Sequence, residues 1–279
     1  MEDTTDRFLV LGGDSRYPAA AESLRKRGYE VEYLDGTEEA SPEEALSRAD
    51  AVLLPLHPFQ DGFLRLGDHT IEGALLPDRL KPGCTVVAGT LPEALAQWFH
   101  SRGVRCVELL EQESYLLPNA MLTAEGALWL IMDQMNRSVR DAEVMIVGWG
   151  RIGRYLANLL DALGASVSVA SRKRKHRLEI LLRGLKPEVT GQYDQGLDQY
   201  DLIVNTVPAP VFSELQMHQI PAETLLLELA SSPGGFPESF EGRVEIARGL
   251  PGSYAPYTAG EQLAQAVLEG LYGEERTLE

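Results

Sequence analysis

The stretch Glu143-Val-Met-Ile-Val-Gly-Trp-Gly-Arg-Ile-Gly153 sets the expectation for the architecture of the whole chain. Its four consecutive apolar residues, from Val144 to Val147, are typical of a short strand buried on both faces. Three glycines follow at the spacing G-x-G-x-x-G, and a helical pattern of apolar residues begins at Ile152 and ends before Gly164. The sequence therefore predicts a strand, a tight glycine turn and a helix, in that order.

The three glycines have different tasks in a turn that binds a dinucleotide. Gly148 permits the tight turn, Gly150 lets the backbone approach a pyrophosphate, and Gly153 lets the helix pack closely on the strand. The helix N-terminus adds free N–H groups and the positive end of the helix dipole. The cofactor is expected to contact the whole turn, including Trp149, Arg151 and Ile152. A glycine turn with a purely structural role is the alternative.

The preferred cofactor is expected from the end of the next strand, residues 166–170. Enzymes that prefer NAD carry an Asp or Glu there, which bonds the ribose 2′-hydroxyl. This chain has Ser171, Arg172 and Lys173 instead, followed by two more cations. A hydroxyl and cations match a 2′-phosphate, so NADP is the expected cofactor. The alternative is a solvated basic start of a helix.

Composition limits the class of protein. At 279 residues the chain is long enough for two domains, and 44% hydrophobic and 24% charged residues are typical of a globular protein. There is no run of about 18 apolar residues, and the first residues do not resemble a signal peptide, so a cytoplasmic protein with no membrane partner is expected. Cys84 and Cys106 lack metal-ligand spacing, and no metal site is expected.

The charge is unevenly distributed. The formal net charge is −17, which argues against a nucleic-acid partner bound through general electrostatics. Between Arg137 and Lys186, however, eleven Lys or Arg stand against four Asp or Glu, a local charge of +7. A basic segment around the glycine turn fits a phosphorylated cofactor, and chance clustering is the alternative.

The N-terminus repeats the theme of a strand followed by a glycine turn. An apolar strand ends at Leu11 and is followed by Gly12-Gly-Asp-Ser-Arg16 and a helical pattern. Because the third glycine is missing, no second dinucleotide is expected. Gly13, Asp14 and Arg16 are instead candidates for binding a carboxylate at the helix N-terminus, with a plain structural turn as the alternative. His57, in a long loop after the strand at residues 51–55, is a candidate proton carrier, with an ordinary surface or packing histidine as the alternative.

A long apolar helix to about residue 139 is expected to link the two halves, with Thr123 as its N-cap. The N-terminus of such a helix is expected to lie in a cleft between two domains. Asn119 and Thr123 are therefore candidate substrate contacts, and Glu125 joins His57 as a candidate acid or base. The alternative is that Thr123 only caps the helix.

Loops after two later strands supply further candidates, because ligands of open α/β sheets bind at the carboxyl ends of the strands. The first loop, expected beside the nicotinamide, contains Asn205, Thr206, Val207 and Pro208. The second contains the candidate substrate residues Ser231, Gly234 and Gly235. A closing helix is expected from about Thr258 to Leu271, and turn chemistry alone is the alternative role for these loops.

Strand and helix patterns alternate through both halves of the chain. The expected fold class is α/β, with two doubly wound, Rossmann-like or flavodoxin-like domains joined by a long helix. We expect a flavodoxin-like N-terminal domain over residues 1–118 and a linking helix with an NADP-binding Rossmann domain over residues 119–256. Residues 257–279 are expected to form a C-terminal closing helix and tail.

Several segments together resemble the family of dipicolinate synthase A subunits, in order and over nearly the whole chain. The glycine turns at residues 12–16 and 147–153 fit this family. So do Pro118-Asn-Ala-Met-Leu-Thr-Ala-Glu-Gly126, Asn205-Thr-Val-Pro208, Leu227-Glu-Leu-Ala-Ser-Ser-Pro-Gly-Gly235 and Leu250-Pro-Gly-Ser-Tyr-Ala-Pro-Tyr-Thr-Ala-Gly260.

The resemblance implies an NADP-linked oxidoreductase that works with a second protein, the B subunit of dipicolinate synthase. Its substrate would be a dihydro- or hydroxy-tetrahydropyridine dicarboxylate, on the branch from the lysine and diaminopimelate pathway to dipicolinate, the calcium chelator of the spore core. Hydride transfer would be assisted by formation of an aromatic ring, so the protein mainly orients two rings and holds two carboxylates. A homo-oligomer is a further possible assembly.

This chain departs from the family pattern at two positions. Ser232 stands where the family often has Arg, and Tyr257 where it often has Lys. Either Arg16, His57 or Arg248 takes over the binding of a carboxylate, or the substrate differs. The alternatives are a non-catalytic NADP-sensing or regulatory subunit, and another two-domain dehydrogenase of the 2-hydroxyacid or alanine dehydrogenase type. The Arg, Glu and His set of the hydroxyacid enzymes is not found in its usual order.

Overall fold

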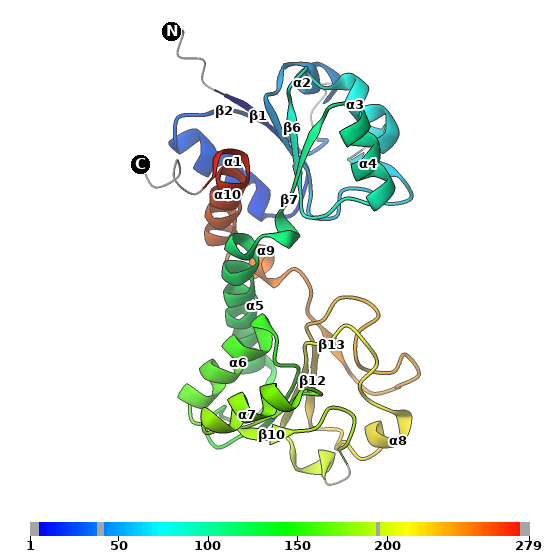
Figure 1. Cartoon of the computed structure of the whole chain (residues 1–279). Coiled ribbons are helices and arrows are strands. Elements are labelled where there is room, and N and C mark those ends of the chain that lie inside the picture. The colour runs from blue at the N-terminus through cyan, green and yellow to red at the C-terminus, as the bar shows by residue number, and fades with distance from the viewer. Residues whose placement is uncertain (1–5, 38–41, 68, 194–195, 274–279) are drawn as a thin grey trace. The chain divides into compact units, whose positions relative to one another are not determined.

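The computed structural model describes residues 6–37, 42–67, 69–193 and 196–273 (Figure 1). The chain divides into two compact units, of which the first comprises residues 1–119 and 251–279 and the second residues 120–250. The segment after residue 256, expected as a separate closing element, is thus grouped with the first unit. None of the helices among the described residues has the length and apolar character needed to cross a membrane.

The first unit is built on a five-stranded parallel sheet with the order β2-β1-β3-β6-β7. Its strands are β1 (Arg7–Leu11), β2 (Glu30–Leu34), β3 (Ala51–Leu53), β6 (Thr85–Ala88) and β7 (Arg105–Glu108). Its helices are α1 (Arg16–Lys26), α2 (Pro42–Arg48), α3 (Leu76–Arg79), α4 (Glu93–Ser101) and α10 (Pro256–Tyr272), with short 3₁₀ turns η1 (Gly73–Leu75) and η2 (Leu109–Glu111). This order is the flavodoxin-like one, as expected.

Alternate residues of β1 enter two different cores. Phe8 and Val10 pack with α1 and α10 on one face of the sheet, whereas Leu9 and Leu11 pack with α2, α3 and α4 on the other. A strand buried on both faces requires an uninterrupted apolar run, and this explains the pattern that predicts β1 from sequence.

Helices α1 and α10 lie side by side (Figure 1) and touch through a glycine. A Cβ added at Gly260 would lie 2.5 Å from the Cβ of Ala19 and 2.6 Å from the carbonyl oxygen of Arg16. The last helix therefore completes the core of the first unit.

The long segment after β3 contains a hairpin that we did not expect. Strands β4 (Phe63–Leu66) and β5 (His69–Glu72) pair in antiparallel register, with Leu64 opposite Ile71. Both of these side chains are buried in the core. The expectation of a long loop after β3 was therefore wrong for the residues of the hairpin.

The linking helix α5 spans Glu113–Gln134 and begins well before the expected start. Thr123 lies inside this helix and is buried, so the expectation that it caps the N-terminus was wrong. Pro118, the last residue of the expected N-terminal domain, is accommodated within the helix at the cost of one backbone hydrogen bond. Burial of Tyr115 and Ala120 on either side stabilises this first part of the helix.

The second unit is a six-stranded parallel sheet with the order β10-β9-β8-β11-β12-β13. Its strands are β8 (Glu143–Val147), β9 (Ser166–Ala170), β10 (Lys186–Glu188), β11 (Leu202–Asn205), β12 (Leu225–Glu228) and β13 (Glu245–Ile246). The remaining elements are α6 (Arg151–Ala162), α7 (Arg174–Leu182), η3 (Leu197–Gln199), α8 (Glu214–Met217) and α9 (Leu250–Tyr254), the last of which spans the boundary of the units. The order is that of a dinucleotide-binding Rossmann sheet, so the expected fold class is confirmed.

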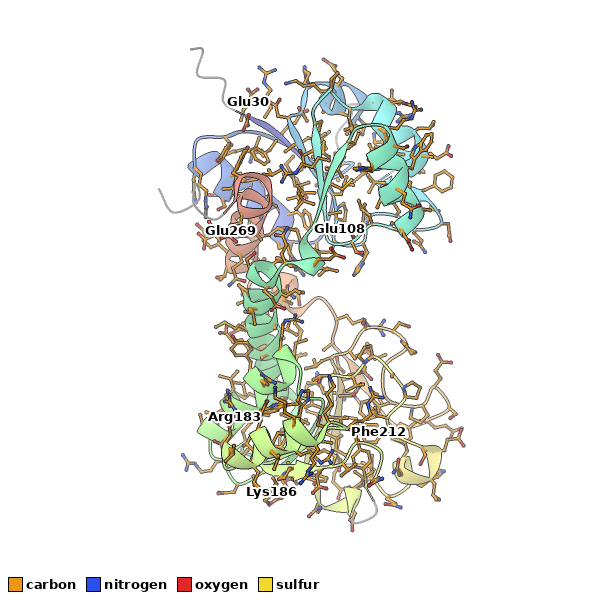
Figure 2. All side chains as sticks on the ribbon, in the orientation of Figure 1. Glu30, Glu108, Arg183, Lys186, Phe212 and Glu269 are labelled. Carbon is orange, nitrogen blue, oxygen red and sulfur yellow. The ribbon has the colours of Figure 1, made fainter. Side chains whose placement is uncertain are left out.

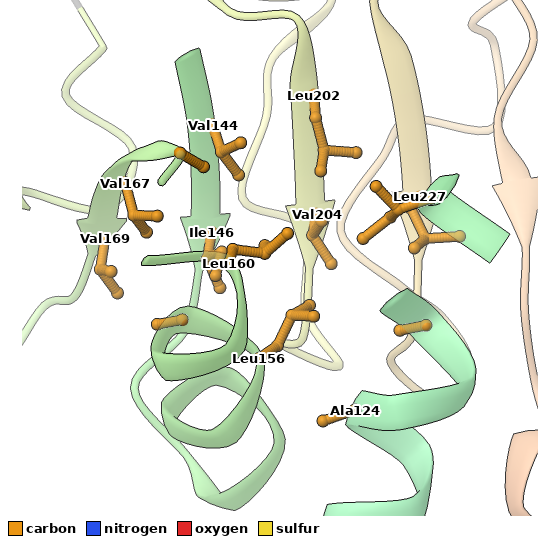
Figure 3. Close-up of a cluster of buried hydrophobic side chains, with 14 of the residues drawn as sticks. Ala124, Val144, Ile146, Leu156, Leu160, Val167, Val169, Leu202, Val204 and Leu227 are labelled. Atoms are coloured by element: carbon orange, nitrogen blue, oxygen red, sulfur yellow. The ribbon is translucent and has the colours of Figure 1, made fainter. Parts of the chain in front are cut away.

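The core of the second unit explains why β8 has the sequence it has. Val144 and Ile146 face α6, where Leu156 and Leu160 meet them, and Val204 of β11 completes the contact (Figure 3). A second cluster on the opposite face includes Met145, Val147 and Phe212, the last of which is labelled in Figure 2. The glycine turn is thereby fixed between two packed elements.

Candidate dinucleotide-binding site

The glycine turn after β8 is shaped by close contacts at two of its three glycines. Gly148 has φ +114°, and a Cβ added there would lie 2.2 Å from Oγ1 of Thr206. That hydroxyl donates to the carbonyl of Val147 at 2.9 Å. A Cβ at Gly153 would lie 2.3 Å from the carbonyl oxygen of Gly148. These two glycines are required by the fold.

Gly150 differs from its neighbours. Its φ of −84° suits any residue, and a Cβ added there would meet no atom within 4 Å. Nothing in the described part of the folded unit therefore requires glycine at this position. It is the N-cap of α6 and has no side chain to occupy the free N–H groups of the helix. Open space at the N-terminus of this helix fits the approach of a phosphate.

A pocket beside this turn collects most of the predicted cofactor residues. Its lining includes the turns after β8, β9 and β11, the parallel strands nearest the point where the strand order reverses. Nine predicted residues line it: Gly148, Trp149, Gly150, Ser171, Arg172, Lys173, Thr206, Val207 and Pro208. Arg151, Ile152, Gly153 and Asn205 were predicted as well but are not among the lining residues. Carboxylate side chains are absent from its described lining.

The loop after β9, which forms the rim of the pocket, is fixed by hydrogen bonds to residues of α7. The Ser171 side chain is buried, and its Oγ lies 3.2 Å from Nδ1 of His176. Nη1 of Arg177 donates to the carbonyls of Ser171 and Arg172, at 2.8 Å each. Arg172 and Lys173 are exposed. The backbone of the loop is fixed while two cationic side chains remain accessible to an anion.

The side chain of Trp149 is held within the fold. Its indole is 3% exposed and donates from Nε1 to a carboxylate oxygen of Glu179 at 3.1 Å. Arg154 donates to the same oxygen at 3.0 Å. The hydrogen bond from Trp149 and the charge of Arg154 lower the pKa of Glu179. The indole therefore connects the glycine turn to α7.

Asn205 has a similar internal role at the end of β11. It is fully buried, and its Nδ2 donates to Glu228 Oε1 at 2.7 Å and to the carbonyl of Val207 at 2.9 Å. Glu228 is 4% exposed and also accepts from the backbone N–H groups of Ala230 and Gly235, at 2.9 and 2.7 Å. This pair of side chains fixes the two loops that follow β11 and β12.

The predicted substrate residues of the second loop lie around that pair. A Cβ at Gly234 would approach Glu228 Oε2 to 2.8 Å, and one at Gly235 would approach Asn205 Nδ2 to 2.5 Å. Ser231 is exposed. The two glycines are thus required by the packing of the loop, and of these three residues Ser231 presents a side chain to solvent.

The first unit brings together four of the predicted substrate residues at the turn after β1. Arg16 is 3% exposed; its Nε donates to Asp14 Oδ1 at 2.8 Å, and its Nη1 donates to Asn119 Oδ1 at 3.2 Å. Nη1 also donates to the hydroxyl of Tyr115 at 2.9 Å. The fourth predicted residue, Gly13, adopts φ +95° in the same turn. Burial alone would disfavour the charge, but Tyr115 and Asp14 raise the pKa of Arg16.

This turn lies at the switch point of its sheet. Strand β2 lies on one side of β1 and β3 on the other, so the turns after β1 and β3 border the crevice where ligands of such sheets bind. His57 follows β3 in the loop of this crevice and is exposed. Glu125 is exposed on α5 and belongs to the second unit. Both remain predictions as catalytic residues.

The two departures from the family pattern have different surroundings. Ser232 is exposed in the loop after β12. The hydroxyl of Tyr257 accepts a hydrogen bond from Nζ of Lys26 at 3.1 Å, and Lys26 also pairs with Glu22 at 2.7 Å. A cation is therefore present beside position 257, contributed by α1.

Three residues that line the pocket were not predicted: Ala170, His176 and Thr190. His176 follows the basic segment directly, and its position five residues after Ser171 on an expected helix was a usable signal. Thr190 follows β10, whose three residues form too short and polar a pattern to be found. Glu228 was also missed, because a strand ending in glutamate carries no sign of its burial.

The sheet order, glycine turn and pocket define the second unit as a dinucleotide-binding domain of the dehydrogenase type. Residues 119–225 match the family model of the NAD-binding domain of D-isomer specific 2-hydroxyacid dehydrogenases. The cofactor class is therefore a nicotinamide dinucleotide. Residues 7–110 match the family model of the N-terminal domain of the dipicolinate synthase A subunit.

Whole-chain comparisons agree with this match. The dipicolinate synthase A subunit of Bacillus subtilis is 27% identical over 287 residues, covering 96% of each chain. The crystal structure of its counterpart from Bacillus halodurans matches with TM-score 0.83 and 25% identity, over 96% of this chain and 98% of the other. The crystal structure of the Bacillus subtilis protein matches with TM-score 0.81 and 26% identity, over 99% and 98%. The chain is similar to the dipicolinate synthase A subunit over at least 96% of its length, and the predicted resemblance is confirmed.

Proposed function

We propose that this protein is the NADP-binding subunit of a dipicolinate synthase. It oxidises a dihydro- or hydroxy-tetrahydropyridine dicarboxylate to dipicolinate together with a B subunit. The observation that carries this proposal is the loop Ser171–Lys173 in a pocket of a dehydrogenase-type domain, within a chain related to the dipicolinate synthase A subunit throughout. The proposal places the activity in the cytoplasm of a sporulating cell.

The preference for NADP over NAD rests on charge. A 2′-phosphate adds two negative charges at most, and charge-assisted hydrogen bonds to Arg are roughly twice as strong as neutral ones. Arg172 and Lys173 are exposed at the pocket rim, and Ser171 adds a hydroxyl. Of the acidic residues near this rim, Glu179 is bonded to Trp149 and Arg154, and Glu188 lines a different pocket. Among the described lining residues, no carboxylate is thus placed to accept from an NAD ribose.

The bound cofactor supplies a hydride acceptor. When a dihydropyridine dicarboxylate loses a hydride to it and a proton to a base or to water, the ring becomes aromatic, so the chain mainly has to bind and orient the substrate. We propose that Arg16 binds one carboxylate. The described residues do not hydrogen-bond its Nη2, while Nε and Nη1 are held by Asp14, Tyr115 and Asn119. His57 in the same crevice is the proposed proton acceptor.

The experiment that tests this function uses purified protein, freshly made dihydrodipicolinate and NADP, with and without the B subunit. We expect NADPH formation measured by its absorbance, with NAD giving a much slower rate. Pyruvate with NADPH or NADH serves as the control for a 2-hydroxyacid dehydrogenase. Consumption of NADPH or NADH with pyruvate would replace the proposal by that activity.

A second arm separates catalysis from cofactor sensing. Arg172→Ala is expected to weaken NADP binding by at least about 1 kcal/mol and to leave NAD binding nearly unchanged. Arg65→Ala, at an exposed position of β4, is the matched control. Tight NADP binding with no turnover in the presence of the B subunit would indicate a regulatory protein instead, and equal losses for both cofactors would refute the assignment of Arg172.

A further inference from the structure

We propose that His176 belongs to the subsite for the 2′-phosphate of NADP and makes the preference for NADP over NAD depend on pH. This inference rests on the proposed function, since it takes NADP as the ligand of the pocket. It goes further by adding a titratable residue that was not among the predicted contacts and by assigning it a regulatory effect.

The geometry places His176 beside the residues expected to meet the phosphate. It lines the same pocket as Ser171, Arg172 and Lys173, and Thr190 lines that pocket after β10. The His176 ring is half-buried, with Nδ1 3.2 Å from Oγ of Ser171. The imidazole is thus oriented by a residue of the strand end where the ribose hydroxyls of a dinucleotide bind. With Nδ1 engaged, Nε2 is the nitrogen available to an anion.

The charged groups around His176 favour its neutral form while the phosphate is absent. Lys173 and Lys175 lie near it on its own segment, and Arg154 faces it from α6; only Glu179, among the described groups, opposes them. Burial first, and then these cations, lower the pKa of His176 below its ordinary value. The residue is therefore mainly neutral at pH 7 in the unliganded protein.

Binding of a phosphate reverses this balance. A phosphate of charge near −2 favours the imidazolium form, so the pKa of His176 rises in the NADP complex and a proton is taken up on binding. By linkage, a group whose pKa is higher in the complex than in the free protein strengthens binding as the pH falls through that range. NAD lacks the 2′-phosphate, and its affinity should not follow His176. The same residue therefore makes NADP selectivity greater under mildly acidic conditions.

The test compares dissociation constants of the full-length protein and His176→Gln for NADP and NAD between pH 5.5 and 8. Glutamine keeps a hydrogen-bonding side chain and cannot titrate in this range. Since the phosphate itself takes up a proton near pH 6, the informative quantity is the ratio of the variant's constant to that of the wild type at each pH. His218→Gln, at an exposed histidine after α8, is the control.

We expect this ratio for NADP to be near 1 at pH 8 and to rise to about 3- to 10-fold at pH 5.5, the size of one charge-assisted contact. For NAD the ratio should stay near 1. A ratio for NADP that is independent of pH, or that changes equally for NAD, would overturn the role of His176. If the wild-type protein binds NADP no more tightly than NAD at pH 8, the cofactor proposal itself is overturned.

A second measurement needs no variant. The ring proton signals of His176, followed by NMR across the same pH range, give its pKa in the free protein and in the two complexes. The pKa should rise with NADP and change little with NAD. An equal pKa in the NADP and NAD complexes would contradict the proposal even if the glutamine variant did not fold.

Discussion

Gly148 and Gly150 stand two residues apart in the turn after β8, yet an added side chain meets different surroundings at each. At Gly148 it would meet Thr206 Oγ1 at 2.2 Å in a backbone of positive φ, whereas at Gly150 it would meet nothing within 4 Å. The first glycine serves the fold, and the second leaves room for a ligand. A substitution at Gly148 should therefore affect mainly stability, and one at Gly150 mainly ligand binding.

Gly150→Ala should leave the free energy of unfolding within about 0.5 kcal/mol of the wild type, because the methyl group enters open space. It should weaken NADPH binding about tenfold or more, because that space is where a pyrophosphate approaches. Denaturant unfolding and fluorescence titration with NADPH measure the two effects. Gly148→Ala is the contrast, and we expect it to lose about 1–3 kcal/mol of stability. Wild-type affinity in Gly150→Ala would refute a dinucleotide at this turn.

Glu228→Gln should destabilise the second unit by about 1–3 kcal/mol. The carboxylate accepts three hydrogen bonds at 4% exposure, and an amide would turn one acceptor into a donor facing Asn205 or Gly235. Unfolding in urea measures the change. Glu223→Gln, at an exposed position before β12, should be neutral. Equal stabilities of the two variants would show that the Asn205–Glu228 pair does not support the loops.

At the scale of the elements, the contact between α10 and α1 decides how alanine at Gly260 changes the stability. Helix propensity alone would predict that alanine stabilises the protein, whereas the contact predicts that it destabilises it. Alanine is favoured over glycine by about 1 kcal/mol inside a helix. At Gly260, however, a methyl group would lie 2.5 Å from Ala19 and force the helices apart.

Gly260→Ala is therefore expected to destabilise the first unit by about 1–3 kcal/mol, the usual cost of overpacking. Thermal unfolding followed by circular dichroism would measure it, with Glu261→Ala, on the exposed side of the same helix, as control. A stabilised Gly260→Ala would mean that the two helices adjust without cost.

The elements that were predictable from sequence are those with a strong local pattern. Strand β8 was found from its uninterrupted apolar run, and α6 from the helical period of its apolar residues. The hairpin of β4 and β5 has only a weak signal in the sequence, since Leu64 and Leu66 alternate before Gly67-Asp68 but Ile71 is the one apolar residue among the four that follow. The start of α5 was not predictable, because tertiary burial outweighed the local preference of Pro118 to end a helix.

The site was predictable to a similar degree and for similar reasons. Residues next to the glycine turn and at strand ends were expected to converge, and most of those residues do line one pocket. The orientation of Asn205 and of the Trp149 indole toward the protein interior could not be predicted from the sequence. The type of a residue does not show whether its polar atoms bond to the protein or to a ligand. Their partners, Glu228 and Glu179, lie 23 residues from Asn205 and 30 residues from Trp149 in the sequence.

At the scale of the whole molecule, each unit has its own sheet and its own cores, and the proposed cofactor pocket is lined by residues of the second unit. NADPH at about 100 times its dissociation constant should therefore add about 2.7 kcal/mol to the stability of that unit. We expect slower hydrogen exchange in β8, β9 and β11 and little change in β1 and β3. Equal protection of both sheets would show that the units unfold together, and NADH at the same concentration is the control for specificity.

The grouping of α10 with the first unit also has a consequence for biosynthesis. The N-terminal sheet lacks the helix that covers α1 until Pro256–Tyr272 has been synthesised, whereas the second unit is continuous in sequence. At about 5–20 residues per second, roughly ten seconds pass while the ribosome adds the intervening residues. During that time the apolar surface of α1 remains uncovered, and the second unit can fold first. The nucleotide-binding part of the nascent chain would then be ready while the N-terminal part still needed protection by a chaperone.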